Sequence, residues 1–136
     1  MAAALLHPFE VCKGIEILSG LHTVSLGLED AYDIQFPAER ENSPQLFPNC
    51  PVVEFKHGSF LDLDWSDATF FFANSTCFDM GMMGRIADCP FPADSFAITL
   101  TKSLPGEKWT VLESFRRPMS WGEATVFIHR RNADFN

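Results

Sequence analysis

The sequence has few cysteines, and none of them lies close to another. The four cysteines occupy positions 12, 50, 77 and 89, with no CxxC pair and no histidine at metal-ligand spacing. Zinc sites and disulfide frameworks both depend on such spacing. We therefore expect no metal site and predict free thiols in a reducing, intracellular compartment, either cytoplasm or nucleus.

Positive charge and long hydrophobic runs are also scarce. The chain has 10 Lys and Arg residues against 18 Asp and Glu, a formal net charge of −8. Binding to phosphates requires clustered cations, so we expect no direct binding to nucleic acid. A basic protein, such as a histone, is the partner that we favour. No apolar stretch approaches the roughly 20 residues that cross a bilayer, and no basic residue precedes the short apolar run at the start. The sequence thus predicts neither a membrane span nor a signal peptide.

Two short basic runs depart from this acidic average. Arg116-Arg117 and His129-Arg130-Arg131 both lie near the end of the chain. We interpret them as the solvated ends of two neighbouring strands, which is the usual place for such runs.

The residues that are present make a globular composition. Hydrophobic residues account for 46% of the 136 residues, and 14 of them are Phe. A chain of this length fits one hydrophobic core, since two smaller cores would each bury too little surface to offset chain entropy. We predict a single domain spanning residues 1–136.

Hydrophobic periodicity predicts alternating strands and helices. A strand at 10–18 precedes a helix that Ser19 caps and that runs to about Arg40, and the Pro-rich segment 41–51 is a connection. Further strands are expected within 51–60, at 68–73 in the middle of a sheet, and at 95–101, with a short helix within 77–89. Two alternating runs around Pro118 predict a final antiparallel pair with a longer loop. The pattern indicates an α/β fold with a mostly parallel sheet.

Ligands of open parallel sheets bind outside the carboxyl ends of the strands, so the residues that follow each strand are candidates. Glu16 lies near the end of the first predicted strand, where a carboxylate can accept both hydroxyls of a ribose. Phe60, beside Ser59, can stack on an adenine. Asn74 brings an amide to the same edge of the sheet. The ordinary alternatives stay open: a solvent-facing charge, a core Phe in a turn, and a helix cap.

The run from His57 to Phe78, HGSFLDLDWSDATFFFANSTCF, resembles the non-SET histone lysine methyltransferases of the disruptor-of-telomeric-silencing type. In that family a G-D-F-L…W segment precedes an apolar strand and an N-N-F-x-F motif. Gly14-Ile15-Glu16 is similar to its G-V-E. The segment from Met119 to His129, with Ser120-Trp121-Gly122 and Thr125-Val126-Phe127-Ile128, is similar to its V-S-W…Y-Y-L-H ending. The matches cover most of the chain in the family's order.

The resemblance implies a class I methyltransferase fold and S-adenosylmethionine as cofactor. It implies Glu16 on the ribose, Ser59 and Phe60 at the adenine, and Asn74 beside the methyl donor as a catalytic residue. Trp121, the second catalytic candidate, would line the channel of the accepting amine. The implied reaction is in-line methyl transfer from a sulfonium, helped by positioning and water exclusion, without a metal.

The sequence also departs from the family's pattern. Ser59 replaces the acid that holds the adenine amino group, and Ser75 replaces the second Asn. Nothing before Glu10 resembles the first strand and its Gly-rich turn, so the sheet is expected to be a truncated Rossmann-like one. Because that strand is central in methyltransferases, we predict that the strand at 10–18 pairs directly with the strand at 68–73.

Three functions follow. The first is a degenerate methyltransferase-like protein, acting as a non-catalytic binding subunit. The second is an active histone lysine methyltransferase completed by homo-oligomerisation or by sequence upstream of Met1, since a strand exchanged between subunits is a low-cost route to dimers. The third is an unrelated α/β protein-interaction module.

Overall fold

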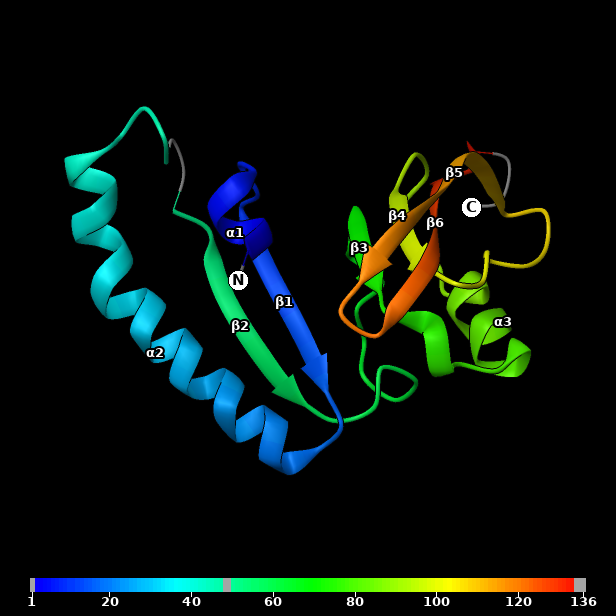
Figure 1. Cartoon of the computed structure of the whole chain (residues 1–136), viewed down its shortest axis with the longest axis horizontal. Coiled ribbons are helices and arrows are strands. Elements are labelled where there is room, and N and C mark those ends of the chain that lie inside the picture. The colour runs from blue at the N-terminus through cyan, green and yellow to red at the C-terminus, as the bar shows by residue number, and fades with distance from the viewer. Residues whose placement is uncertain (1, 48–49, 134–136) are drawn as a thin grey trace. The chain divides into compact units, whose positions relative to one another are not determined.

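The computed structural model describes residues 2–47 and 50–133. The chain forms two compact units, Met1–Leu63 and Asp64–Asn136 (Figure 1). That the whole chain is one domain stays a prediction. No helix in the described ranges has both the length and the apolar character needed to cross a membrane.

The amino-terminal unit is a strand–helix–strand motif, as predicted. Its elements are α1 (Ala2–Leu6), β1 (Val11–Glu16), α2 (Ser19–Asn42) and β2 (Val52–His57). The two strands are parallel, with Val11 opposite Val52 and Glu16 opposite His57. Both carboxyl ends therefore lie at one edge of the pair. α2 runs beside β2 (Figure 1).

Side chains of α2 form hydrogen bonds with backbone groups of β2 and of the residue before it. The Glu29 carboxylate accepts the Phe55 N–H at 3.0 Å, and His22 Nε2 donates to the Phe55 carbonyl at 3.3 Å. The Tyr32 hydroxyl donates to the Pro51 carbonyl at 3.0 Å, and burial raises its pKa, so it stays a donor. These contacts block strand pairing at that edge of β2.

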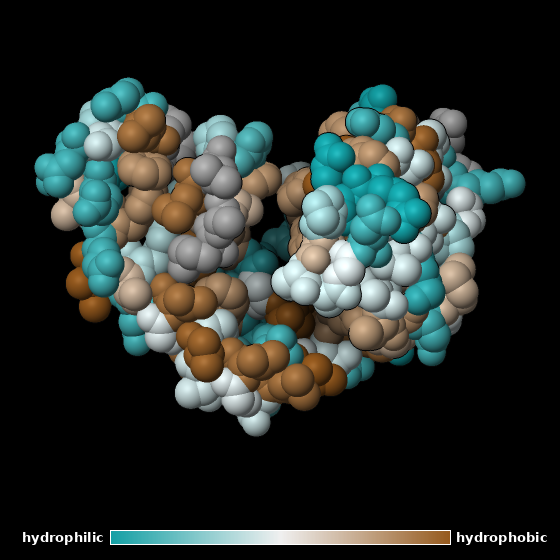
Figure 2. All heavy atoms as spheres, in the orientation of Figure 1, coloured by the Kyte–Doolittle hydropathy of each residue, from teal (hydrophilic) through white to brown (hydrophobic). Residues whose placement is uncertain are grey.

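α2 buries only the carboxyl-terminal part of the apolar stripe that predicts it, which consists of Leu21, Val24, Leu28, Ala31 and Tyr32. Leu21, Val24 and Leu28 are all about half exposed or more, and hydrophobic side chains gather over the first part of the helix in Figure 2. Tyr32 is buried together with Phe36, on which it stacks at 4.7 Å, and the two rings pack with Ala4 and Val53 into a small core. The helix cap was also wrong, because Leu18 is the cap residue and makes no side-chain bond.

Gly14 allows β1 to lie against this core. A Cβ atom at Gly14 would lie 2.5 Å from Phe55 Cδ1, and the Phe55 ring is itself packed on the core. We expect Gly14→Ala to cost about 1–3 kcal/mol of unfolding free energy, because the ring has to move out of its packed position. Urea unfolding followed by far-UV circular dichroism measures this.

Gly27→Ala is the matched control for that substitution. Gly27 lies within α2, and nothing lies within 4 Å of the position its Cβ would take. The alanine should therefore stabilise the helix by about 0.5–1 kcal/mol. Equal effects of the two substitutions would contradict the packing role of Gly14.

The carboxyl-terminal unit contains the remaining elements: β3 (Phe70–Ala73), the 3-10 turn η1 (Ser75–Cys77), α3 (Met80–Asp88), β4 (Phe96–Leu100), β5 (Trp109–Met119) and β6 (Gly122–Arg131). Its sheet has the order β3-β4-β6-β5, with β3 and β4 parallel and the other pairs antiparallel. Asp79 caps α3 by accepting the Met82 N–H at 2.7 Å.

One prediction about the sheets was wrong. β3 is an edge strand of its sheet among the described residues, although its apolar sequence suggested a central position. The predicted pairing of β1 with β3 would join strands of the two units, and it stays a prediction. An apolar run shows that a strand is covered, and side chains can cover it without a second neighbouring strand.

The final hairpin was predicted, but its loop is shorter than expected. Met119 pairs with Gly122, so Ser120 and Trp121 alone form the turn. Pro118 lies within β5, which is tolerated because β5 is an edge strand and one side of it needs no partner.

An aromatic cluster forms the core of the carboxyl-terminal unit. Phe71 and Phe91 stack at 4.9 Å, and Trp65 and Trp109 contact both of them edge-on. Trp109 Nε1 donates to the Ala87 carbonyl at 3.2 Å, which joins α3 to the sheet.

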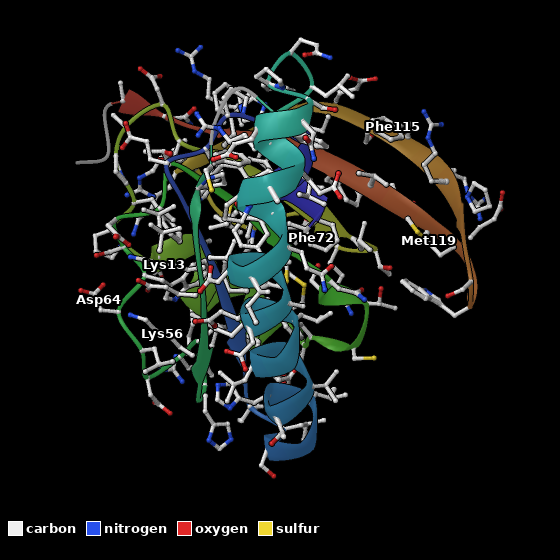
Figure 3. All side chains as sticks on the ribbon, turned by 90° about the vertical axis from the view of Figure 1, so that its left-hand side faces the viewer. Lys13, Lys56, Asp64, Phe72, Phe115 and Met119 are labelled. Atoms are coloured by element: carbon white, nitrogen blue, oxygen red, sulfur yellow. The ribbon has the colours of Figure 1, made fainter. Side chains whose placement is uncertain are left out.

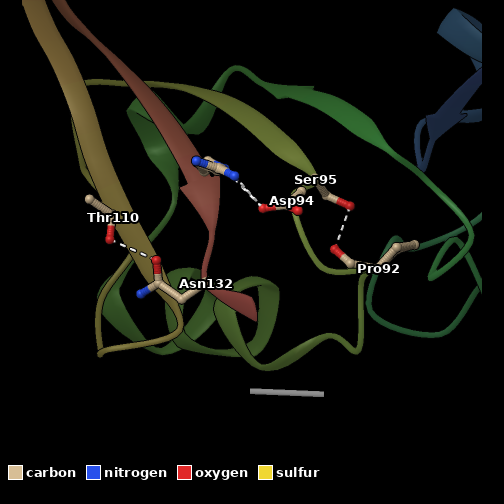
Figure 4. A network of polar contacts seen from close by, with 6 residues as sticks. Pro92, Asp94, Ser95, Thr110 and Asn132 are labelled. Carbon is tan, nitrogen blue, oxygen red and sulfur yellow. Dashed lines mark hydrogen bonds and ion pairs between the residues drawn. The ribbon is translucent and has the colours of Figure 1, made fainter. Parts of the chain in front are cut away.

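The second basic run is not uniformly solvated, contrary to our interpretation. His129 and Arg131 are buried, and only Arg130 is exposed. Arg130 contacts Asp94 through Nη2 at 2.6 Å and Nε at 3.0 Å, as Figure 4 shows. Residues 129 and 131 share one face of β6, so alternation along the strand decides which of them reaches solvent.

Candidate functional site

The turn after β3 is fixed to the end of β4 by Ser75. The Ser75 hydroxyl is completely buried, donates to the Leu100 carbonyl at 2.7 Å and accepts the Leu100 N–H at 3.2 Å. The Ser75 hydroxyl therefore holds two strand ends together. Asn74 is thereby placed at the carboxyl edge of the sheet, as predicted.

The exposed Asn74 side chain belongs to a chain of hydroxyl groups. Thr76 Oγ1 donates to Asn74 Oδ1 at 3.2 Å and lies 3.1 Å from Thr101 Oγ1. Since the Thr76 proton is used on Asn74, Thr101 is the donor to Thr76. Lys102 Nζ donates to the Thr76 carbonyl at 3.2 Å. We call these four residues the Asn74 cluster.

Asn74 occupies the cap position of a helix, but its side chain does not act as a cap. Asn74 precedes η1 as its cap residue, but its side chain makes no capping hydrogen bond. Its bond to Thr76 is the interaction that the structure shows.

Thr101 has a strained backbone. Its φ angle is +70°, a left-handed conformation that a β-branched residue rarely adopts and that costs about 1–3 kcal/mol. The Thr101 N–H donates to the Thr125 carbonyl at 2.7 Å, and the Thr99 hydroxyl donates to the Lys102 carbonyl at 2.7 Å. Strain of this kind persists only where neighbours enforce it, and it concentrates at functional sites.

Trp121 lies at the same end of this sheet. Thr125 on β6 bonds to Thr101, and the β5–β6 hairpin continues four residues beyond Thr125 to Trp121, or about 13 Å along the strand. Phe115 and Met119 lie along β5 toward that tip (Figure 3). Trp121 is 56% exposed. Its lining of an acceptor channel stays a prediction.

Glu16 ends β1 in the amino-terminal unit and is half-buried. Its Oε1 accepts the Leu18 N–H at 2.8 Å. The facing residue on β2 is His57, whose Nε2 donates to the Ile17 carbonyl at 3.1 Å and whose ring stacks on His22 at 5.0 Å. Glu16 therefore lies opposite His57 in the strand pair and holds the Leu18 backbone, and its contact with a ribose stays a prediction.

Ser59 and Phe60 lie in the tight turn after β2. The Ser59 hydroxyl accepts the Leu61 N–H at 3.1 Å, and its carbonyl accepts the Asp62 and Leu63 N–H groups at 3.0 Å. Gly58, with a φ of +150°, begins the turn. Phe60 is half-buried. The Ser59 hydroxyl thus stabilises the turn, and its contact with an adenine stays a prediction.

The predicted residues divide between the two units. Glu16, Ser59 and Phe60 belong to the amino-terminal unit, and Asn74 and Trp121 belong to the other. That Glu16, Phe60 and Asn74 surround a common hollow stays a prediction. Within the part of the chain that the structure describes, no group of three potential ligands can hold a metal ion.

Sequence reasoning missed five residues of these two sites. Thr101 and Lys102 follow the fourth predicted strand directly, so the rule that selected Asn74 would have selected them. Thr76 stands within the turn already considered. His22 and His57 carried no signal, because their proximity arises only when α2 lies beside β2.

Comparison with known proteins agrees with the predicted fold. No family profile and no curated protein sequence matches the chain. Several solved structures do, and two of them are bacterial proteins. The Escherichia coli protein yhhF, described as a candidate methyltransferase, has a TM-score of 0.61 and 10% identity, over 91% of this chain and 64% of that one. The Haemophilus influenzae protein HI0767, described as a candidate methylase, has a TM-score of 0.55 and 10% identity, over 90% and 73%. The chain thus has a methyltransferase-like α/β fold and spans less than two thirds of yhhF.

Proposed function

We propose that the protein is a methyltransferase-like protein of the disruptor-of-telomeric-silencing type that does not transfer methyl groups by itself and serves as a binding subunit. One contrast supports the proposal: candidate binding residues follow the strands, but residues 2–10 lack the turn that would bind the rest of the cofactor. Glu16 and Asn74 end parallel strands, but residues 2–10 form α1 and a short link to β1. No Gly-rich turn lies there to approach the methionine portion of S-adenosylmethionine.

The residues fit only part of that cofactor. S-adenosylmethionine supplies a methyl group on a sulfonium, and the chain's own residues would bind and orient it. Glu16 Oε1 accepts a hydrogen bond from the Leu18 N–H, so Oε2 is the oxygen that would accept a ribose hydroxyl. Asn74 offers an amide at the edge of the other sheet, where it can position a reacting group. The acidic net charge of −8 suits a basic protein such as a histone as partner.

Titration calorimetry with S-adenosylmethionine tests the proposal on the whole chain. We expect no saturable heat up to about 1 mM cofactor, because the methionine portion has no backbone to bind it. We also expect no transfer of labelled methyl groups to histones. Saturable binding tighter than millimolar would overturn the non-catalytic assignment.

An active methyltransferase completed by a second copy of the chain is the second candidate. The strain at Thr101 favours it, because a decayed site has no reason to keep a costly backbone conformation. This candidate predicts methyl transfer whose specific rate rises with protein concentration. An Asn74→Ala protein that kept full transfer would show that Asn74 has no role in it. The shared methyltransferase-like fold counts against an unrelated interaction module.

A further inference from the structure

Lys102 is a cation without a carboxylate partner among the described residues. Other basic residues make ion pairs, such as Lys108 with Asp88, Arg116 with Glu123 and Arg130 with Asp94. Lys102 makes no such pair within residues 2–47 and 50–133, and its ammonium donates only to the Thr76 carbonyl. An ammonium has three N–H donors, so two remain available after the bond to Thr76. This cation stands out in a chain with a net charge of −8.

Asn74 presents a second set of donors. Its Oδ1 accepts from Thr76, which turns the Nδ2 amide away from the hydroxyl chain. No acceptor for this amide is found among the described residues. Thr76 bonds to both donor residues, through its hydroxyl to the Asn74 side chain and through its carbonyl to the Lys102 ammonium.

We propose that the Asn74 cluster is a binding site for an anionic oxygen, as carried by a carboxylate or a phosphate group. Asn74 Nδ2 and Lys102 Nζ are the donors, and Thr76 and Thr101 are the positioning residues that orient them. Hydrogen bonds from an ammonium to an anionic oxygen are about twice as strong as neutral ones. The site uses only residues of the carboxyl-terminal unit and does not depend on whether S-adenosylmethionine binds.

The same sheet provides an internal comparison. Thr110 donates to Asn132 Oδ1 at 2.7 Å, the same hydroxyl–amide contact, as Figure 4 shows. There the amide is already used, because Asn132 Nδ2 donates to the Glu107 carbonyl at 2.6 Å. Lys108 is neutralised by Asp88 at 2.7 Å. The Thr110–Asn132 pair has its donors satisfied, whereas the Asn74 cluster has donors left for a ligand.

Nuclear magnetic resonance titrations of the whole chain test the site. The probes are inorganic phosphate and, separately, acetate, each at constant ionic strength, and the readout is the Asn74 side-chain amide, assigned by its loss in Asn74→Ala. We expect saturable shifts with a dissociation constant of about 1–10 mM. Lys102→Gln should weaken binding at least about tenfold, because the charged donor is lost. Thr76→Val should weaken it as well, and Thr76→Ser should restore it.

The controls remove equivalent groups elsewhere. Lys108→Gln removes one positive charge and Thr110→Val removes one hydroxyl, and neither should alter the titration. A response to phosphate but not acetate supports the site and identifies a phosphate ligand, and the reverse identifies a carboxylate. Shifts that stay linear with both probes, or equal losses in Lys102→Gln and Lys108→Gln, overturn the proposal. Neither result depends on the calorimetry with S-adenosylmethionine.

Discussion

Replacing Trp109 by alanine should lower the unfolding free energy of the carboxyl-terminal unit by about 3–5 kcal/mol. Trp109 is 5% exposed and contacts Phe71 and Phe91 at centroid distances of 5.6 and 5.8 Å. Its indole N–H also bonds to the Ala87 carbonyl at the end of α3. The alanine would leave a cavity and would remove the hydrogen bond that joins the helix to the sheet. Both losses lower the unfolding free energy.

Trp121→Ala is the control with the same change of side chain. Trp121 lies at the tip of the hairpin and is 56% exposed, so its removal should change stability by no more than about 0.5 kcal/mol. Urea unfolding followed by far-UV circular dichroism compares the two variants with the parent protein. Similar losses from both substitutions would show that the aromatic cluster is not the core of this unit.

The secondary structure was largely predictable from local patterns. The strand–helix–strand start and the final hairpin follow from periodicity within segments of 10–25 residues, which is the range over which such signals act. The position of each strand in a sheet was not predictable in the same way. The apolar run of β3 suggested a central strand, and β3 lies at an edge. Edge or centre is decided by long-range partners, which a local pattern does not contain.

The buried face of α2 shows the same limit. Leu21, Val24, Leu28, Tyr32 and Phe36 follow one another at intervals of three or four residues, so they form one stripe on the helix. Only the carboxyl-terminal part of this stripe is buried, where large rings bury the most surface and Tyr32 can bond to Pro51. The location of β2 beside the helix decides which part is covered, and the sequence does not show it.

The sequence predicted which candidate residues lie at strand ends, but it did not predict their contacts with one another. The rule of carboxyl-end loops selected Asn74 and Glu16, and the structure places both at strand ends. It did not reveal that Thr76 connects Asn74 to Thr101 and Lys102, because the contacts of Thr76 with these two residues join positions 25 and 26 apart in the chain. Side-chain chemistry identified the candidates, and tertiary contacts determine what they can bind.

His129 should make the carboxyl-terminal unit less stable as the pH falls below neutrality. It is completely buried, and burial lowers its pKa below the ordinary value. Nδ1 lies 3.4 Å from the Ala97 carbonyl and Nε2 accepts the Leu104 N–H at 3.1 Å. A second proton would have to enter at Nε2, against a donor already there.

The direction of the effect follows from proton binding. In the unfolded chain His129 binds a proton near pH 6.5, whereas the folded unit resists it to lower pH. Stability is therefore complete above about pH 6.5 and is lost as the pH falls through and below that value. His129 is the single histidine between Asp64 and Asn136, and all three tryptophans lie there too. Urea unfolding followed by tryptophan fluorescence between pH 5.5 and 7.5, a range above the usual carboxyl pKa values of about 4, isolates this step.

His129→Gln separates the charge from the packing. A glutamine oxygen can still accept from Leu104, but the side chain does not titrate, so we expect a flat stability profile over the same pH range. His129→Ala should cost about 2–5 kcal/mol at pH 7.5, because it leaves the Leu104 N–H and the Ala97 carbonyl buried without a partner. A parent protein whose stability does not change across this range would contradict the neutral, bonded state of His129. The histidine would then have to carry its charge inside the fold, which neither its burial nor the Leu104 donor allows.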